Sequence, residues 1–218
     1  MGAKTWMLAI SDGEPRDILK SKPQLNRPEV AELAKRLFPS EELEPLEDGN
    51  LYYTCPPDDE VLIGCFPGLS IIAAFEFGID YPSHLPTRFL QAAAGNTVYL
   101  HAMHSVVDWF AYAKWLDGKL VRSLSLSPDS GILEDIGVRA AFEVPYWDGV
   151  HSPFDPDEED GDYPFLFHPL DLGEAALLEI FGYQIEGVID PDHLDAEEIP
   201  LAAFRRIETP KPWWKFWG

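Results

Sequence analysis

Alternation of hydrophobic and polar positions between residues 97 and 127 predicts a β-meander. Three successive runs are rich in β-branched and aromatic residues and are separated by short polar breaks: "NTVYLHAMH", "VVDWFAYAKWL" and "KLVRSLSLS". Asp117-Gly118, between the second and third runs, favours a two-residue type I′ turn, because glycine readily adopts the positive φ that this turn requires. We therefore expect antiparallel strands with short connections in this region.

Other apolar runs along the chain predict further strands and a few helices. Helical spacing of apolar residues occurs in "RPEVAELAKRLF", "LPTRFLQAAAG" and "DLGEAALLEIFGY". Strands are expected at residues 4–10, in "LYYTC", on both sides of Pro67-Gly68, in "AAFEVPYW" as an edge strand and in "IPLAAFRRI". This order predicts an α+β fold: a mainly antiparallel sheet, with the meander around residues 97–127, and a few packed helices. We expect one domain over residues 1–207, followed by an aromatic C-terminal tail at 208–218.

A turn at Asp117-Gly118 also predicts which side chains of the meander share a face. Simple pairing outward from the turn places Trp115 beside Leu120 and Ala113 beside Arg122, on the face expected to be the core. The opposite face of the meander has mixed side chains and is expected to be partly wet. A guanidinium in an apolar layer requires a carboxylate or backbone oxygens, because an unpaired buried charge costs several kcal/mol. Glu76, in the apolar run "IIAAFEF", is the first candidate for this partner. The alternative is that Arg122 extends along the sheet and keeps its charged end in water.

The segment "LHAMHSVVDWFAY" brings together the residue types of a catalytic or metal site. A turn at residues 104–105 would align His101, Asp108 and Ser127 across one face, but with the aspartate in the middle, whereas a catalytic triad needs the histidine there. If the strand instead continues through His104, the two histidines fall on opposite faces and cannot share a metal ion. We interpret the segment as structural and predict no catalytic residues and no metal site. A ligand-contacting surface and a catalytic or metal role remain the alternatives.

The net charge of the chain limits the classes of molecule that it is expected to bind. The chain has 38 acidic residues, 16 Lys and Arg, and a net charge of −22. Between residues 140 and 204 there are 17 Asp or Glu and no Lys or Arg. Such a surface repels nucleic acid and anionic lipid, so we expect neither as a partner. A solvated acidic face is the simplest interpretation, and a surface for a basic partner, or a mimic of a nucleic-acid backbone, is the alternative.

Motifs for cofactors, metals and secretion are not found in the sequence. There is no Walker A loop, GxGxxG or HExxH, so no cofactor is expected. The acidic run at 154–162 does not fit an EF-hand loop, and its binding of divalent cations is left open. Cys55 and Cys65 are not part of a CxxC motif, and no apolar run reaches the roughly 18 residues of a membrane span. We expect reduced thiols, no membrane span and a cytoplasmic location.

The C-terminal segment "KPWWKFWG" concentrates aromatic residues at the end of the chain: Trp213, Trp214, Phe216 and Trp217. Exposed to water, this apolar area would promote aggregation, so it is expected to dock on its own domain, on a partner or at a membrane interface. The membrane interface is disfavoured, because the segment is too short for a stable amphipathic helix and the acidic chain opposes anionic lipid. Docking on its own domain is one hypothesis. A protein partner, or self-association, is the other, because tryptophan is over-represented among binding hot spots.

Four segments resemble an actinobacterial family of domains of unknown function: the N-terminal "MGAKT", then "MHSVVD", "VRSLSLSPDSGI" and "FHPLDLGEAAL". The resemblance covers roughly residues 1–207. It implies a soluble bacterial cytoplasmic protein and supplies no activity or catalytic residues.

Two functional hypotheses follow from the sequence. The favoured one is an acidic protein-interaction or regulatory module with the aromatic tail as an anchor. The alternative is a hydrolase-like enzyme that uses the polar residues His101, His104, Asp108 and Ser127 of the meander. The two hypotheses differ in whether these side chains converge in a pocket.

Overall fold

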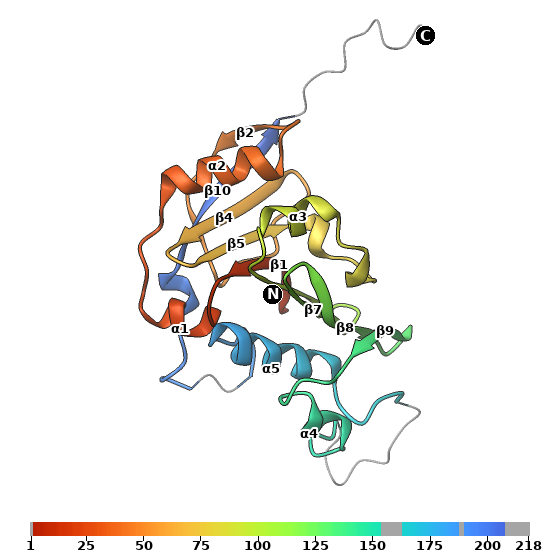
Figure 1. The fold of residues 1–218 in the computed structure, drawn as a ribbon. Helices are drawn as coiled ribbons and strands as arrows, with labels where there is room; N and C mark the ends of the chain where they lie inside the picture. The colour runs from red at the N-terminus through yellow and green to blue at the C-terminus, as the bar shows by residue number, and fades with distance from the viewer. Residues whose placement is uncertain (1, 154–162, 188–189, 208–218) are drawn as a thin grey trace, which may run out of the picture.

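The structure, a computed structural model, describes residues 2–153, 163–187 and 190–207 of the chain (Figure 1). Within these ranges ten strands form one antiparallel sheet in the order β2-β10-β4-β5-β1-β6-β7-β8-β9, with β3 beside β10. The strands are β1 (Lys4–Ser11), β2 (Glu42–Pro45), β3 (Gly49–Asn50), β4 (Glu60–Phe66), β5 (Leu69–Ala74), β6 (Thr97–His104), β7 (Trp109–Leu116), β8 (Lys119–Ser127), β9 (Gly131–Gly137) and β10 (Pro200–Ile207). The predicted α+β class is confirmed, and so is the meander of β6, β7 and β8.

Helices cover both faces of this sheet (Figure 1). The helices are α1 (Pro15–Lys20), α2 (Arg27–Leu37), α3 (Thr87–Ala92), α4 (Val144–Trp147) and α5 (Pro169–Phe181), and the short 3-10 turns are η1 (Phe75–Phe77), η2 (Pro82–His84) and η3 (Ala196–Glu198). Helices α2 and α3 pack on one face, where Leu33, Leu37 and Phe89 are buried. Helices α1 and α5 cover the other face, where Leu19 and Leu177 are buried. We call these the α2 face and the α5 face.

Because both faces are covered, the central strands bury side chains on both sides. In β7, Ala111 and Ala113 belong to the core of the α2 face, whereas Phe110 and Tyr112 belong to the core of the α5 face. The meander face expected to be partly wet is therefore buried: Tyr112 is 2% exposed and Ser123 is fully buried. That expectation was wrong because a single strand pattern does not show that a second helical layer covers the sheet.

The turn predicted at Asp117-Gly118 is present, and both residues have positive φ, of 48° and 72°, as a type I′ turn requires. The first two pairs outward from the turn also agree with the prediction. A β-bulge then follows, because Lys114 pairs with Arg122 and leaves Val121 as the extra residue. Beyond it the pairing differs by one residue from the prediction, so the remaining side chains of β8 lie on the opposite face from the one expected.

Several local expectations were also wrong. The segment "LYYTC" is not a strand, and "AAFEVPYW" contains the helical turn α4 instead of an edge strand. The strands β2, β3 and β9 were not anticipated. The division into a domain over 1–207 and a tail over 208–218 stays a prediction, although the sheet itself runs from Lys4 to Ile207. No helix in the described ranges is long and apolar enough to cross a membrane.

Candidate functional site

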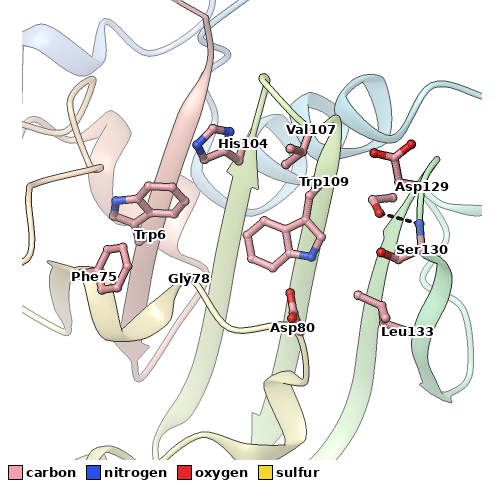
Figure 2. Close-up of a pocket in the computed structure, with 11 residues that line it drawn as sticks. Trp6, Phe75, Gly78, Asp80, His104, Val107, Trp109, Asp129, Ser130 and Leu133 are labelled. Atoms are coloured by element: carbon pink, nitrogen blue, oxygen red, sulfur yellow. Dashed lines mark hydrogen bonds between the residues drawn. The ribbon is translucent and has the colours of Figure 1, made fainter.

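A cleft of about 380 Å³ opens on the α2 face, where β1, the β6–β7 turn, η1 and the β8–β9 turn meet (Figure 2). The residues that line it are Trp6, Phe75, Gly78, Asp80, His104, Val107, Trp109, Ser127, Asp129, Ser130 and Leu133. Its walls are mainly aromatic and aliphatic, and two carboxylates lie at its rim (Figure 2). We call this site the aromatic cleft.

The pairing of β1 with β6 positions the side chains that form one wall of the aromatic cleft. Trp6 in β1 pairs with Ala102 in β6, so its ring lies on the same face as His104, at 5.6 Å between ring centroids. Phe75, at the start of η1, meets Trp6 edge-on at 6.2 Å. Gly78 allows this close approach, because a Cβ atom there would lie 3.1 Å from the Trp6 ring. Phe75 is 55% exposed, so this wall presents aromatic surface to solvent.

The opposite wall depends on the irregular register of β8 and β9. The Nε1–H group of Trp109 donates a hydrogen bond to Ser125 Oγ at 3.1 Å, which fixes the indole ring in the cleft. Ser125 reaches this face because the bulge at Val121 shifts β8 by one residue. The pairing of β8 with β9 has a second irregularity between Ser125 and Leu126, which leaves Leu133 of β9 as the extra residue. The side chain of Leu133 also lines the cleft.

Two carboxylates at the rim of the aromatic cleft favour a cation and outnumber the nearby positive charge of Lys4, which lies opposite His104. Burial, together with the charge of Lys4, lowers the pKa of His104 below its usual value, so this ring is neutral near pH 7. Asp80 and Asp129 are exposed and supply negative charge at the rim. Cations bind favourably against tryptophan and phenylalanine rings, and more so where carboxylates are near. The arrangement can therefore hold a lysine or arginine side chain, or a quaternary ammonium group.

His101, one of the predicted polar cluster, lies away from the cleft in the core of the α5 face. It is fully buried, and its Nε2 lies 3.0 Å from the carbonyl oxygen of Gly173 in α5. Because a carbonyl only accepts, Nε2 carries the proton, and Nδ1 accepts from the Thr5 hydroxyl at 2.8 Å. Burial lowers the pKa of His101 to about 4. Both ring nitrogens are thus engaged, and His101 ties the sheet to α5.

The structure does not bring the other three members of the predicted cluster into a triad with His101. The β6–β7 connection is a four-residue turn at 105–108, not a tight turn at 104–105, so strand β6 continues through His104. Asp108 Oδ2 lies 3.6 Å from His168 Nε2. His104 and Ser127 both line the aromatic cleft, and Ser127 Oγ accepts from the backbone N–H of Ser130.

Arg122 is buried as expected, at 4% exposure, but its predicted partner was wrong. Its Nε and Nη2 donate to the two carboxylate oxygens of Glu143 at 2.9 and 2.6 Å, and Nη1 donates to Asp135 at 2.6 Å. Glu76 instead pairs with Arg206 at 2.8 Å and with Arg88 at 3.7 Å. The bulge at Val121 moves Arg122 to the α5 face, whereas Glu76 follows β5 at the edge of the α2 face.

Two groups of predicted residues lie outside the described residues: the tail anchor at Trp213, Trp214, Phe216 and Trp217, and the acidic run at 154–162. Among the residues that the structure does describe, no three His, Cys, Asp or Glu side chains form a group that could hold a metal ion. Cys55 and Cys65 are both free thiols.

Comparison with known proteins gives one match. A family model described as a family of unknown function, DUF6928, matches residues 5–204, which confirms the resemblance to a domain-of-unknown-function family. No curated protein and no solved structure matches the chain.

Proposed function

The chain belongs to the family of unknown function DUF6928, and we propose that this member is a protein-interaction module whose aromatic cleft binds a basic segment of a partner protein. The observation that carries the proposal is the composition of the cleft. Three aromatic side chains, Trp6, Phe75 and Trp109, line a space whose rim holds Asp80 and Asp129. Aromatic residues dominate the energetics of protein interfaces, and carboxylates at the rim select for a positive partner.

The physical basis is the attraction of a cation to aromatic ring faces. Each such contact contributes about 0.5–2 kcal/mol, depending on how far the cation is removed from water. The net charge of −22 adds a long-range attraction that speeds the encounter with a basic partner. The neutral His104 ring adds apolar surface without adding a competing charge.

The proposal keeps two expectations from the sequence. The partner is a protein and not a nucleic acid, because the acidic chain repels phosphate groups. The location is the cytoplasm, in keeping with two free cysteines.

A titration with designed peptides tests the proposal. The probe is a fluorescein-labelled peptide that alternates lysine and tryptophan, and the comparison peptide has glutamate at every lysine position. Because the chain's own tail is basic and aromatic, we would titrate both the intact chain and a variant with Trp213→Ser, Trp214→Ser and Trp217→Ser. Fluorescence anisotropy should show saturable binding of the lysine peptide alone.

Matched variants separate the aromatic cleft from general charge attraction. Asp80→Asn with Asp129→Asn should weaken binding about tenfold, and Phe75→Ser should weaken it by a similar factor. Asp58→Asn with Asp148→Asn makes the same change in net charge at two other exposed positions and should have less than a twofold effect. Equal effects of the two double variants, or no binding by either chain, would contradict the proposal.

A further inference from the structure

We propose that residues 208–218, the C-terminal tail, bind in the aromatic cleft of their own chain and compete there with the partner. This inference rests on the proposed function, because it assigns a regulator to the same site. The tail would act as a built-in competitor, and a partner segment would have to displace it. The argument combines the chemistry of the tail with the position of the last described residues.

The tail has the chemistry that suits the aromatic cleft. Its sequence, "ETPKPWWKFWG", carries three tryptophans and a phenylalanine, interleaved with Lys211 and Lys215. These are the first basic residues after Arg205 and Arg206. A lysine flanked by aromatic residues complements a cleft that offers Trp6, Phe75 and Trp109 together with Asp80 and Asp129.

The last described strand, β10, ends at the same end of the sheet as the aromatic cleft. Near its end, β10 places Phe204 opposite Val61, and Val61 lies opposite Ala74 in β5. These side chains pack together on the α2 face, in the same cluster as Trp6 and Trp109. Ala74 precedes Phe75, and its neighbour Ala73 lies opposite Met7, which follows Trp6, so the last described residues lie at the end of the sheet that carries the aromatic cleft.

Arg206 marks the start of a path from β10 to the cleft. Its guanidinium contacts Glu76 at 2.8 Å and lies over the Phe38 ring, also on the α2 face. Glu76 is adjacent in sequence to Phe75, which forms the near wall of the aromatic cleft. The ion pairs of Glu76 with Arg206 and Arg88 leave Asp80 and Asp129 as the acids facing an incoming lysine.

Chain length is sufficient for the tail to reach the site. Three strand spacings separate β10 from β1 and five separate β10 from β7, which at about 4.8 Å each gives about 14 and 24 Å. Trp213 lies six residues beyond Ile207, a reach of about 20 Å in extended backbone, and Trp217 reaches about 34 Å. The aromatic residues thus reach the interval between Trp6 and Trp109. A tethered segment is present at an effective concentration in the millimolar range, so even a weak contact is populated.

A site-specific photo-crosslink in the intact chain tests the inference. Val107 lines the cleft and is 48% exposed, so p-benzoylphenylalanine at this position should not disturb the core. Irradiation at low micromolar concentration, followed by peptide mass spectrometry, should join position 107 to residues 212–218 within a single chain. The same probe at Val150, which is 71% exposed and follows α4 beyond the α5 face, is the control and should give at least fivefold less of this product.

The outcomes separate this inference from the proposed function. The product should disappear in the variant with Trp213→Ser, Trp214→Ser and Trp217→Ser. Tail crosslinks confined to chains of doubled mass would overturn docking within one chain and point to self-association. Absence of tail crosslinks from position 107 would overturn the inference in every form. If the product forms but saturating lysine–tryptophan peptide does not reduce it, the tail docks and the proposed partner binding fails.

Discussion

At the scale of single residues, the buried arginine is the clearest case of charge satisfied inside the core. Arg122 makes two parallel hydrogen bonds to Glu143, a carboxylate that is fully buried. The backbone N–H of Ala140 and the hydroxyl of Tyr112 also donate to this carboxylate. Such a site costs free energy to desolvate, and the energy is recovered only while every partner remains in place.

Removing both partners should therefore cost less than the sum of the two single removals. We expect Arg122→Leu to lower the free energy of unfolding by about 3–5 kcal/mol, because it leaves the Glu143 carboxylate without its counter-charge in the core. Arg122→Leu with Glu143→Leu should be milder than the sum of the single changes by at least 1 kcal/mol. Urea unfolding measures both.

Glu76 provides the comparison for this double-variant cycle. Arg122→Leu combined with Glu76→Leu should be additive within about 0.5 kcal/mol, because Glu76 contacts Arg206 and Arg88 instead. Coupling between Arg122 and Glu76, with none between Arg122 and Glu143, would contradict the observed network.

The sequence predicts that Arg122 is buried but not which acid it meets. Its burial follows from its place in an apolar strand. Glu143 lies 21 positions away, in a segment whose alternation suggested a strand and which in fact forms the turn of α4. The signal available was a lone acid within "AAFEVPYW", and its meaning depends on packing that a strand pattern does not encode.

At the scale of elements, one extra residue decides which side chains meet. The bulge at Val121 turns Ser123 and Ser125 toward Ala113 and Ala111, and sends Leu124 to the α5 face. Gly137 of β9 lies against this bulge, since a Cβ atom there would lie 2.0 Å from the carbonyl oxygen of Val121. Glycine is required at this position to pair β9 with the bulged strand.

Two glycines, one in the β7–β8 turn and one in β9, give a matched test of this requirement. Gly118 and Gly137 both have positive φ, 72° and 85°, but a Cβ atom at Gly118 meets no atom within 4 Å. Gly118→Ala should lower the free energy of unfolding by about 1–2 kcal/mol through backbone strain alone. Gly137→Ala should cost at least about 2 kcal/mol more, because β9 must move away from Val121. Equal losses in urea unfolding would contradict the role assigned to Gly137.

The positions of helices and strands could be predicted from the sequence more fully than the registers in which the strands pair. The meander, the turn at Asp117-Gly118 and helices α2 and α5 follow from local spacing and turn chemistry. The aromatic cleft does not, because Trp6, Phe75 and Trp109 come from three distant segments and meet only through sheet order. Neither bulge has a local signature such as a mid-strand glycine, so the wall formed by Trp109 and Leu133 could not be read from the sequence.

At the scale of the whole molecule, α5 is held to the rest of the fold through two adjacent residues, Gly173 and Glu174. Gly173 bonds to His101, where burial disfavours a positive charge, and at Glu174 burial disfavours a negative charge. The Gly173 carbonyl accepts from His101, whose pKa burial lowers to about 4. Glu174 accepts from the backbone N–H groups of Ile185 and Glu186, and burial raises its pKa to about 7. His101 therefore favours folding at higher pH, and Glu174 favours folding at lower pH.

These two shifts should nearly cancel in the pH dependence of stability. The His101 contribution is complete above its ordinary pKa of 6.5 and is lost as the pH falls toward 4. The Glu174 contribution is complete below its ordinary pKa of 4.5 and is lost as the pH rises toward 7. Between pH 4.5 and 6.5 the folded chain binds one proton more at Glu174 and one fewer at His101, so the pair contributes little slope.

Glu174→Gln should expose the His101 contribution. Over pH 5.0–6.5 the free energy of unfolding should rise with pH more steeply in this variant than in the natural chain, by up to about 1.4 kcal/mol per pH unit. Urea unfolding at half-unit steps measures the slope. Glu179→Gln, at a side chain of α5 that is 56% exposed, should leave the slope unchanged. Identical slopes in all three chains would show that Glu174 titrates as an exposed carboxyl does.

The two outer strands of the described sheet affect how readily copies of the chain aggregate. The described sheet stops at β2 on one side and β9 on the other, and each outer strand presents free backbone groups that could template a foreign strand. β2 has only four residues, carries exposed Glu42 and Glu44 and ends at Pro45, which has no N–H group to donate. β9 is bent by its irregular pairing at Leu133 and bears Asp135. Both borders therefore discourage strand addition, so copies of this chain should resist fibril-like stacking even at high concentration.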